Sequence, residues 1–531
     1  MNGLQRNYPR ADSPKRVKVN SPLERGIRWL VSFGLVLMLV VVVPAPVPAQ
    51  PKIQKRSRIT RALRELQRDL RAIIERPSFA TTRWGILVES LDGRQVIFSH
   101  NPTQLFTPAS NMKLYTTAAA LVHLGPDFRF RTSVYATAKP DERGHLEGDL
   151  ILYGRGDPNL STRTVAHGVL TPLSRLADQL YDAGVRDVFG DIVGDESYFV
   201  GPRLGVAWEW DDLQWYYGTE VSALTLDDNA VEIIIQPGSQ IGEPARLYTR
   251  PETSYVTILN HVVTVESGAA QRIIVDRPLG GNTVEVWGTI PLTSLGYRAS
   301  LAISDPARYA AHQFRQELLR RGIRVHGRAT SADWRYRREH PLPVSSLVEL
   351  AFVESIPLRE EIRILNKISQ NLHAELLLRT LGAVVKKEGS DTRGLEVVSE
   401  FLQSLGARMQ GIRFRDGSGL SRQNLISPTT TVDLLRGIRA HPQGDIFLAS
   451  LPVAGEDGTL ERRMRETPAA GRVRAKTGTL AYTYTLSGYL TTISGRELVF
   501  SIMVNDHTGE AADAVRAIDE ICARLSAFTD R

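Results

Sequence analysis

Three short motifs with reactive side chains lie far apart in this chain and in a fixed order. They are Ser110-Asn-Met-Lys113, Ser369-Gln-Asn371 and Lys476-Thr-Gly478. A hydroxyl, two amines and an amide can act on one molecule only if the fold brings the three segments together. The chain must therefore close a long loop between the first two motifs, and the residues on either side of that loop must form one common unit.

The first motif has the spacing of a helix start. Pro108 precedes the run that contains Ser110 and Lys113, and proline is favoured in the first turn of a helix. Residues three apart share one face of a helix, so we expect the hydroxyl and the amine within reach of each other. Burial and a neighbouring cation such as Lys476 would lower the pKa of Lys113 and allow it to accept the serine proton. A lone Ser-x-x-Lys motif would more often be an exposed helix start.

The second motif needs an extended or loop conformation, because residues two apart then point the same way. From such a loop Ser369 could relay a proton to a leaving amine. Asn371 could donate a hydrogen bond to a substrate amide while it contacts Lys113. The alternative is that Ser369 caps a helix, since an apolar run follows it.

The third motif lies on an expected strand at residues 472–479. There Lys476 and the hydroxyl of Thr477 could hold a carboxylate, and glycine at the next position leaves room for a substrate backbone. The backbone N–H groups of Thr479 and Ser110 could together form an oxyanion hole. A turn cluster is the alternative, and it fits poorly because the strand pattern continues on both sides.

Strand patterns at the two ends of the chain predict one sheet. They cover the hairpin at 84–100 and the runs 472–479, 485–491 and 497–504, followed by a closing helix at 510–525. A long helix is expected at 361–381. Between the first two motifs we expect a mainly β insertion, with strands at 149–154, 190–195, 231–236, 272–275 and 284–287 and helices near 169–183 and 307–321. These patterns predict an α+β fold, with an antiparallel sheet flanked by helices and interrupted by a large insertion.

The N-terminal segment has the pattern of a leader sequence. A long basic segment precedes an apolar run at 29–43, and Val47-Pro48-Ala49 follows a proline-rich stretch. This order predicts a secretory signal peptide at 1–49, and hence a periplasmic or exported protein. An uncleaved signal anchor is the alternative, although the apolar run is shorter than the roughly 20 residues of a membrane span.

Residues 50–80 form an expected basic linker with an amphipathic helix at 58–75. The helix has one apolar stripe, formed by Leu63, Leu66, Leu70, Ile73 and Ile74. We expect this stripe to pack on the enzyme domain, and loose membrane association of residues 52–76 is the alternative. The net charge of +7 is concentrated in residues 1–28 and 52–76. The remainder is net negative, so we expect no nucleic-acid partner.

Further motifs surround the first three. They are Phe106-Thr-Pro-Ala-Ser-Asn-Met-Lys113, Gly156-Asp-Pro158, Ile192-Val-Gly-Asp195, Asn366-Lys-Ile-Ser-Gln-Asn371 with Ala374-Glu375, Asp416-Gly-Ser-Gly-Leu-Ser421 and Leu451-Pro-Val-Ala-Gly455. From about residue 84 onward the chain thereby resembles the class C low-molecular-mass penicillin-binding proteins, the D-alanyl-D-alanine carboxypeptidase/endopeptidase family. The resemblance implies a transpeptidase/serine β-lactamase-like domain, divided into 81–132 and 346–531 by two nested inserted domains at 133–345.

The resemblance also implies roles for single residues. By it, Ser110 is the acylated serine, Lys113 the proton acceptor, Ser369 and Asn371 the second motif, and Lys476 the ligand of the substrate carboxylate. Arg422 resembles the family's arginine that meets the free end of a diaminopimelyl side chain. Asp227 is a candidate acidic partner at that place.

We therefore expect an exported serine D-alanyl-D-alanine carboxypeptidase that acts on peptidoglycan peptides, and cleaves cross-links, through an acyl-enzyme. β-Lactams would be covalent inhibitors, and neither a cofactor nor a metal is expected. A serine β-lactamase is one alternative; the large insertion disfavours it, and no deacylating glutamate can be placed. A peptidoglycan-binding scaffold with an inactive site is the other, and it fits poorly because all three motifs are complete.

Overall fold

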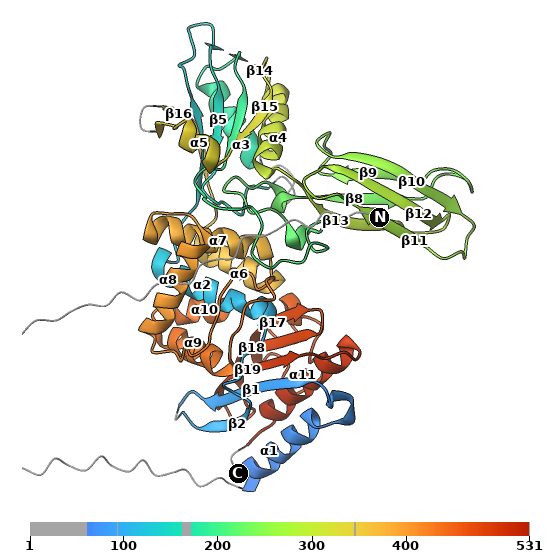
Figure 1. Ribbon diagram of the computed structural model, residues 1–531, viewed down its shortest axis with the longest axis vertical. Coiled ribbons are helices and arrows are strands. Elements are labelled where there is room, and N and C mark those ends of the chain that lie inside the picture. The colour runs from blue at the N-terminus through green and yellow to red at the C-terminus, as the bar shows by residue number, and fades with distance from the viewer. Residues whose placement is uncertain (1–60, 93, 162–170, 345–346, 530–531) are drawn as a thin grey trace, which may run out of the picture. The chain divides into compact units, whose positions relative to one another are not determined.

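The computed structural model describes residues 61–92, 94–161, 171–344 and 347–529 (Figure 1). The expected signal peptide at 1–49 and the first part of the basic linker lie outside these residues. Within the described ranges, no helix combines the length and the apolar character that crossing a bilayer requires.

One antiparallel sheet joins strands from the two ends of the described chain. Its order is β17-β18-β19-β1-β2, with β1 at Arg83–Ser90, β2 at Val96–His100, β17 at Val473–Leu480, β18 at Thr483–Thr491 and β19 at Glu497–Asn505. The central pairing places Arg83 opposite Asn505 and Ser90 opposite Leu498. The sheet predicted from the sequence is thereby confirmed.

The two faces of this sheet support two hydrophobic cores, because successive side chains of a strand point to opposite faces. Ile86 and Val88 pack with α1 (Arg61–Ile74) and α11 (Ala511–Ser526). Leu87 points the other way, into a core with α2 (Met112–Leu124). Five further helices belong to the core that contains Leu87 and α2. They are α6 (Leu358–Ile368), α7 (Asn371–Lys386), α8 (Asp391–Ser404), α9 (Pro428–Ala440) and α10 (Gly444–Ser450) (Figure 1).

Helix α1 confirms the expected packing of the amphipathic segment. All the residues of its apolar stripe are buried, and they belong to the same core as α11 and the sheet. The stripe therefore has no free surface for a bilayer, and membrane association through it is not supported.

The long helix expected at 361–381 is divided in two, which corrects the prediction. α6 ends at Ser369, a residue with φ of 63°, and α7 begins at Asn371. The side chain of Gln370, rather than that of Ser369, caps α7 by accepting a hydrogen bond from the N–H of Leu372. A left-handed residue ends a helix by redirecting the backbone, so the break presents the second motif at a corner between two helices.

The insertion begins with a mixed sheet of order β15-β7-β5-β3-β16. Its strands are β3 (Arg131–Ala136), β5 (Leu150–Tyr153), β7 (Ile192–Asp195), β15 (Ala329–Ala332) and β16 (Val348–Glu354); a small second sheet contains β4 (His145–Leu146), β6 (Asp187–Val188) and β14 (Arg324–Val325). The helices are α3 (Pro172–Asp182), α4 (Pro306–Arg321) and α5 (Trp334–Glu339). Since β3 pairs with β16, the inserted sheet extends beyond the expected limits of 133 and 345 on both sides.

A second unit is nested between β7 and α4. It contains two three-stranded sheets, β13-β8-β9 and β10-β12-β11. The strands are β8 (Ala230–Gln236), β9 (Arg246–Arg250), β10 (Thr257–Val265), β11 (Arg272–Asp276), β12 (Thr283–Pro291) and β13 (Tyr297–Ala302). The expected nesting of two inserted, mainly β domains is confirmed.

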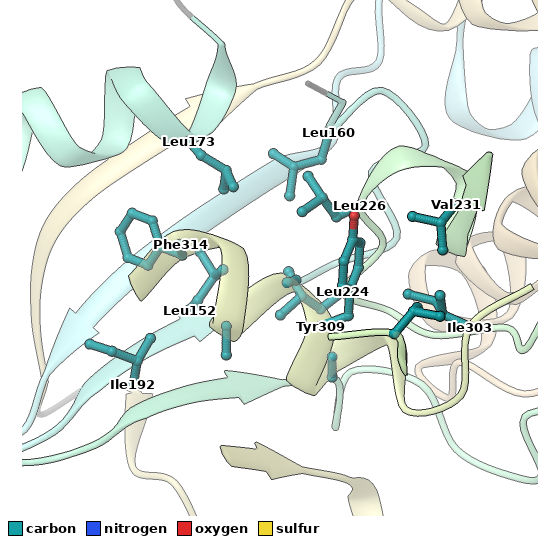
Figure 2. Close-up of a cluster of buried hydrophobic side chains, with 14 of the residues drawn as sticks. Leu152, Leu160, Leu173, Ile192, Leu224, Leu226, Val231, Ile303, Tyr309 and Phe314 are labelled. Carbon is teal, nitrogen blue, oxygen red and sulfur yellow. The ribbon is translucent and has the colours of Figure 1, made fainter. Parts of the chain in front are cut away.

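One hydrophobic cluster connects the two inserted domains. Figure 2 shows Leu152 and Ile192 of the first domain in one group with Tyr309 and Phe314 of α4 and with Val231 of the nested domain. Helix α4 thus packs against both domains.

Candidate active site

The serine of the first motif lies in a helical turn at the start of α2. Residues Ala109–Asn111 form a single 3-10 turn, and α2 follows directly. The amine of Lys113 lies 3.0 Å from the Ser110 hydroxyl, as the helical spacing predicts. It also donates hydrogen bonds to Oδ1 of Asn371 at 2.6 Å and to the carbonyl of Ser418 at 2.7 Å. The first and second motifs therefore meet at this amine.

The Ser418 carbonyl is held in place by a buried carboxylate. Glu375 of α7 accepts hydrogen bonds from the backbone N–H groups of Gly417 and Ser418, the latter at 2.7 Å. Asp416 closes the same loop by accepting from the N–H of Ser421 at 2.6 Å. Burial, and after it the nearby charge of Asp416, raises the pKa of Glu375 to about 8. This loop explains why the Asp416–Ser421 motif accompanies the catalytic motifs.

The two lysines of the site have lowered pKa values. Burial lowers the pKa of Lys113 to about 7, although the charges of Asp416 and Glu375 oppose the shift. Burial also lowers the pKa of Lys476, and the charge of Lys113 lowers it further. A lysine with a pKa near 7 is partly neutral at neutral pH, so it can accept a proton. Burial, rather than the expected neighbouring cation, is the main cause for Lys113.

The second and third motifs meet at Ser369. The amine of Lys476 on β17 donates to the Ser369 hydroxyl at 2.8 Å and to the carbonyl of Thr477 at 2.9 Å. The Thr477 hydroxyl donates to the hydroxyl of Thr459 at 2.8 Å. A cation and two hydroxyls thus lie together at one edge of the site, an arrangement that suits a carboxylate.

Close packing explains the glycine of the third motif. A Cβ at Gly478 would lie 2.2 Å from Oγ1 of Thr485 and 2.9 Å from the backbone nitrogen of Ser110. Without a side chain, β17 can approach the turn that carries the nucleophile. Ser110 and Thr479 both line the same cleft. Their N–H groups are the candidates for an oxyanion hole.

These residues open into a cleft of about 570 Å³. One wall comes from the insertion, by way of the loop segment between β7 and β8, which contributes Glu209, Asp211, Asp212, Tyr216 and Tyr217. The loop is attached to the catalytic domain at two points: the Tyr217 carbonyl accepts a hydrogen bond from Asn371 at 2.9 Å, and the Trp208 indole donates to Asp416 at 3.0 Å. The insertion therefore contributes directly to the site.

The two expected ligands of a diaminopimelyl side chain have different positions. Arg422 lines the cleft and forms an ion pair with Glu209. Asp227 is fully buried, its carboxylate accepts a hydrogen bond from the Ser161 hydroxyl at 2.9 Å, and it is not among the residues that line the cleft. We therefore correct the assignment of Asp227. The turn at Asp227–Asn229 directs this carboxylate toward Ser161, and the acids beside Arg422 come from the loop with Glu209.

Sequence reasoning missed several contributors to the site. They are the carbonyls of Ser418 and Tyr217, the hydroxyl of Thr459, and the acids Glu209, Asp211 and Asp212. Backbone carbonyls leave no mark in a sequence, and the acidic loop is distant from every motif. Two of these residues carried a signal: Ser418 lies within the Asp416–Ser421 motif, and Thr459 lies in the segment that continues the Leu451–Gly455 motif.

Among the residues described, no cluster of histidine, cysteine, aspartate and glutamate has the arrangement of a metal site. A serine hydroxyl, an amine with a pKa near 7 and hydrogen-bond donors, the kinds of group that acyl transfer uses, lie together around Ser110.

Comparisons with known proteins agree with this geometry. The sequence pattern of the D-Ala-D-Ala carboxypeptidase 3 (S13) family matches residues 66–525 of this chain. A D-alanyl-D-alanine carboxypeptidase from Actinomadura sp. is 37% identical over 481 residues, which cover 88% of this chain and 85% of that protein. The D-alanyl-D-alanine carboxypeptidase DacB of Haemophilus influenzae is 27% identical over 428 residues, with 80% and 85% covered.

Solved structures show the same fold. The crystal structure of penicillin binding protein 4 (dacB) from Haemophilus influenzae has a TM-score of 0.74 and 26% identity, and the match covers 86% of this chain and 99% of that one. The same protein has also been solved in complex with a β-lactam, with a TM-score of 0.69 and 24% identity over 86% and 99% of the two chains. Because the family match covers most of its length, the chain belongs to the D-Ala-D-Ala carboxypeptidase 3 (S13) family and is a serine-type D-alanyl-D-alanine carboxypeptidase.

Proposed function

We propose that this carboxypeptidase uses Ser110 as its nucleophile and Lys113 as its base, and that it also cleaves peptidoglycan cross-links. The observation that carries the proposal is the contact between the two side chains. The buried amine lies 3.0 Å from the hydroxyl, and its pKa of about 7 leaves it partly neutral. A neutral amine at this distance can remove the serine proton as the oxygen attacks.

Groups in the cleft can carry out both proton transfers of the acylation step. Ser110 Oγ forms a bond to the carbonyl carbon of the penultimate D-alanine, and the peptide C–N bond breaks. Lys113 takes the hydroxyl proton, and Ser369 passes a proton to the departing amine. Water then cleaves the ester and restores the serine. Lys476, which donates to Ser369 at 2.8 Å, holds the terminal carboxylate of the substrate together with Thr477.

The charges at one end of the cleft favour a zwitterionic side chain. Arg422 provides a guanidinium for a carboxylate, and Asp211 and Asp212 provide carboxylates for an ammonium group. The free end of a diaminopimelyl residue carries both charges. Its carboxylate would take the place of Glu209 on Arg422. The same site would accept a cross-link, because there the leaving amine belongs to a second peptide chain.

Digestion of purified muropeptides tests this proposal. With the wild-type protein we expect pentapeptides to lose one alanine and cross-linked dimers to give monomers, as weighed by mass spectrometry. The Ser110→Ala variant serves as the control and should give neither product. If the wild type releases alanine but leaves the dimers intact, the proposed endopeptidase activity is wrong. If the wild type and Ser110→Ala give equal products, the proposed role of Ser110 is wrong.

Penicillin labelling separates the alternatives. β-Lactams resemble the acyl substrate, so we expect a stable covalent adduct. Rapid hydrolysis of the adduct would indicate a β-lactamase, and the absence of any adduct would indicate an inactive scaffold.

We further propose that the mature protein is exported, on the basis of the leader at 1–49. N-terminal sequencing of the protein recovered from the exported fraction tests this. We expect Gln50 as the first residue. An intact leader in a membrane fraction that resists a high-salt wash would indicate a signal anchor instead.

A further inference from the structure

A second cleft, of about 500 Å³, lies where the two inserted domains meet. Its lining comes from the loops before β10 and β12, from α4 and from the segment before β15: Ser254, Tyr255, Asn282, Arg308, His312, Arg315, Gly327, Arg328 and Ala329. It shares no lining residue with the cleft that contains Ser110. It is therefore a separate cavity.

Helix α4 presents a basic face to this cleft. Tyr309 and Phe314 are buried in the core that connects the two inserted domains (Figure 2), which fixes the rotation of the helix. Arg308, His312 and Arg315 follow the spacing of a single helical face, and all three line the cleft. The basic face is thus a consequence of how the helix is packed.

The guanidinium groups of this cleft lack carboxylate partners among the described residues, although the carboxylate of Asp191 accepts a hydrogen bond from the backbone N–H of Arg328 at 2.8 Å. Within the described part of the chain, neither Arg308 nor Arg315 nor Arg328 forms an ion pair, and none of the lining residues is acidic. By contrast, the neighbouring Arg321 and Arg324 pair with Asp178 and Asp187. These two arginines outside the cleft therefore have carboxylate partners, whereas the three that line it have none among the described residues.

The pKa of His312 is affected by the positive charge of this cleft. Burial lowers the pKa of His312, and the charges of Arg315 and Arg308 lower it further. Its Nε2 lies 3.2 Å from the Ser254 hydroxyl. A bound anion would oppose the repulsion from the two guanidinium groups, so the site is arranged for a negative ligand.

Backbone contacts hold the guanidinium groups without neutralising them. Arg315 donates from Nε to the Gly327 carbonyl at 3.2 Å and from Nη2 to the Val325 carbonyl at 3.1 Å. Arg308 donates from Nε to the Ala329 carbonyl at 3.3 Å. Arg308 and Arg315 keep terminal N–H donors for a ligand, and these contacts position both side chains before the ligand arrives. Such preorganisation reduces the entropic cost of binding.

We propose that this cleft binds the phosphate group of a larger polar molecule. Three guanidinium groups and an imidazole surround one cavity, and a tetrahedral phosphate accepts hydrogen bonds from several directions, whereas a planar carboxylate is satisfied by one bidentate arginine. The cavity is much larger than a phosphate group. Tyr255 supplies an aromatic ring to its wall, which suits the C–H face of a hydroxyl-rich body such as a glycerol or a sugar. The amide of Asn282, also in the wall, is already hydrogen-bonded to Ser304 through both its oxygen and its nitrogen.

Calorimetric titration of the mature full-length protein tests the proposal. The probes are glycerol 3-phosphate, a short poly(glycerol phosphate) and glycerol as the uncharged match. We expect at least one phosphate probe to bind and glycerol not to bind. Stronger binding of glycerol 3-phosphate would indicate that the natural ligand is a small phosphomonoester. Stronger binding of poly(glycerol phosphate) would indicate that it is a phosphodiester polymer.

Variants locate the binding. Arg328→Gln is the main variant, because this side chain forms no hydrogen bond or ion pair with the described residues and its loss should not affect folding. We expect about 10-fold weaker binding, the effect of one charge-assisted contact, and a similar loss for Arg308→Gln. Arg64→Gln, on the exposed face of α1, is the matched control and should bind normally. Carboxypeptidase activity should be unchanged in all three. No binding of either phosphate probe, or equal binding by all variants, would overturn the proposal.

Discussion

Lys113 donates a hydrogen bond to Oδ1 of Asn371 at 2.6 Å, and this bond joins two helices that the whole insertion separates in sequence. The nucleophile and its base lie at the start of α2 before the insertion, and α7 follows α6 in the second half of the domain after it. Asn371 also donates to the Tyr217 carbonyl of the inserted loop. The same amide therefore connects both halves of the catalytic domain and the insertion.

Replacement of Lys113 by arginine should nearly abolish acylation. The guanidinium keeps the charge but cannot be deprotonated at usable pH, so it cannot accept the proton of Ser110. The expected loss in the rate of labelling by a fluorescent penicillin is about 100- to 10,000-fold, the usual contribution of a general base. Lys139→Arg, at an exposed position, is the matched control and should label normally. A near-normal rate for Lys113→Arg would mean that another group activates the serine.

Acylation should increase with pH through about 7. The active form of Lys113 is the neutral amine, and its pKa is lowered to about 7, so the fraction in that form rises as the pH passes this value. The measurement is the second-order rate constant for acylation by benzylpenicillin between pH 5 and pH 8. A rate that falls over this interval would contradict the assignment of the base.

Arg422→Ala should affect one class of substrate more than another. For peptides that end in a free diaminopimelyl group, kcat/KM should fall about 10- to 100-fold, the effect of one charge-assisted contact. Matched peptides with lysine at that position lack the carboxylate and should be affected much less. An equal loss on both peptides would assign Arg422 a structural role, through its ion pair with Glu209.

His373 should stabilise the junction between the insertion and the catalytic domain. Its ring lies 2.7 Å from Glu361 and 2.9 Å from Asp228. Burial alone would lower the pKa of His373, but the two carboxylates outweigh burial and raise it to about 10. His373→Ala should reduce the free energy of unfolding by about 3–5 kcal/mol, the cost of removing one partner from a buried pair.

The pH dependence provides a second test of this junction. A raised pKa contributes stability that is fully present below the ordinary value of 6.5 and is lost as the pH rises through about 10. In urea titrations the wild-type protein should lose this contribution between these values, and His373→Ala should not. His261→Ala, at an exposed position of β10, should behave as the wild type. The same pH dependence in both variants would exclude His373 as its source.

The sequence predicted the parts of the structure that follow from local patterns. Alternation and helical spacing were sufficient for the five-stranded sheet, for α4 and for the contact between Ser110 and Lys113. The chemistry of the second motif called for a loop at Ser369, whereas the apolar pattern continued through it and predicted one helix; the structure has the loop, and the Ser369 hydroxyl there accepts a hydrogen bond from Lys476.

The remaining errors concern residues whose role depends on distant partners. Asp227 has the chemistry of a cleft acid, but its turn directs it to Ser161. Glu209 lies in a loop without a motif and reaches Arg422 only after folding. Several strands of the insertion were missed as well, including β9, β10, β13 and β15. The strands β3 and β16 were also missed, and their pairing joins segments from opposite ends of the insertion.

Peptide mapping by mass spectrometry after incubation with benzylpenicillin shows which residue carries the acyl group. We expect one penicilloyl adduct, located on the peptide that contains Ser110, and no adduct on Ser110→Ala, which should keep the wild-type melting temperature. An adduct on any other residue, or an undiminished adduct on Ser110→Ala, would contradict the role of Ser110.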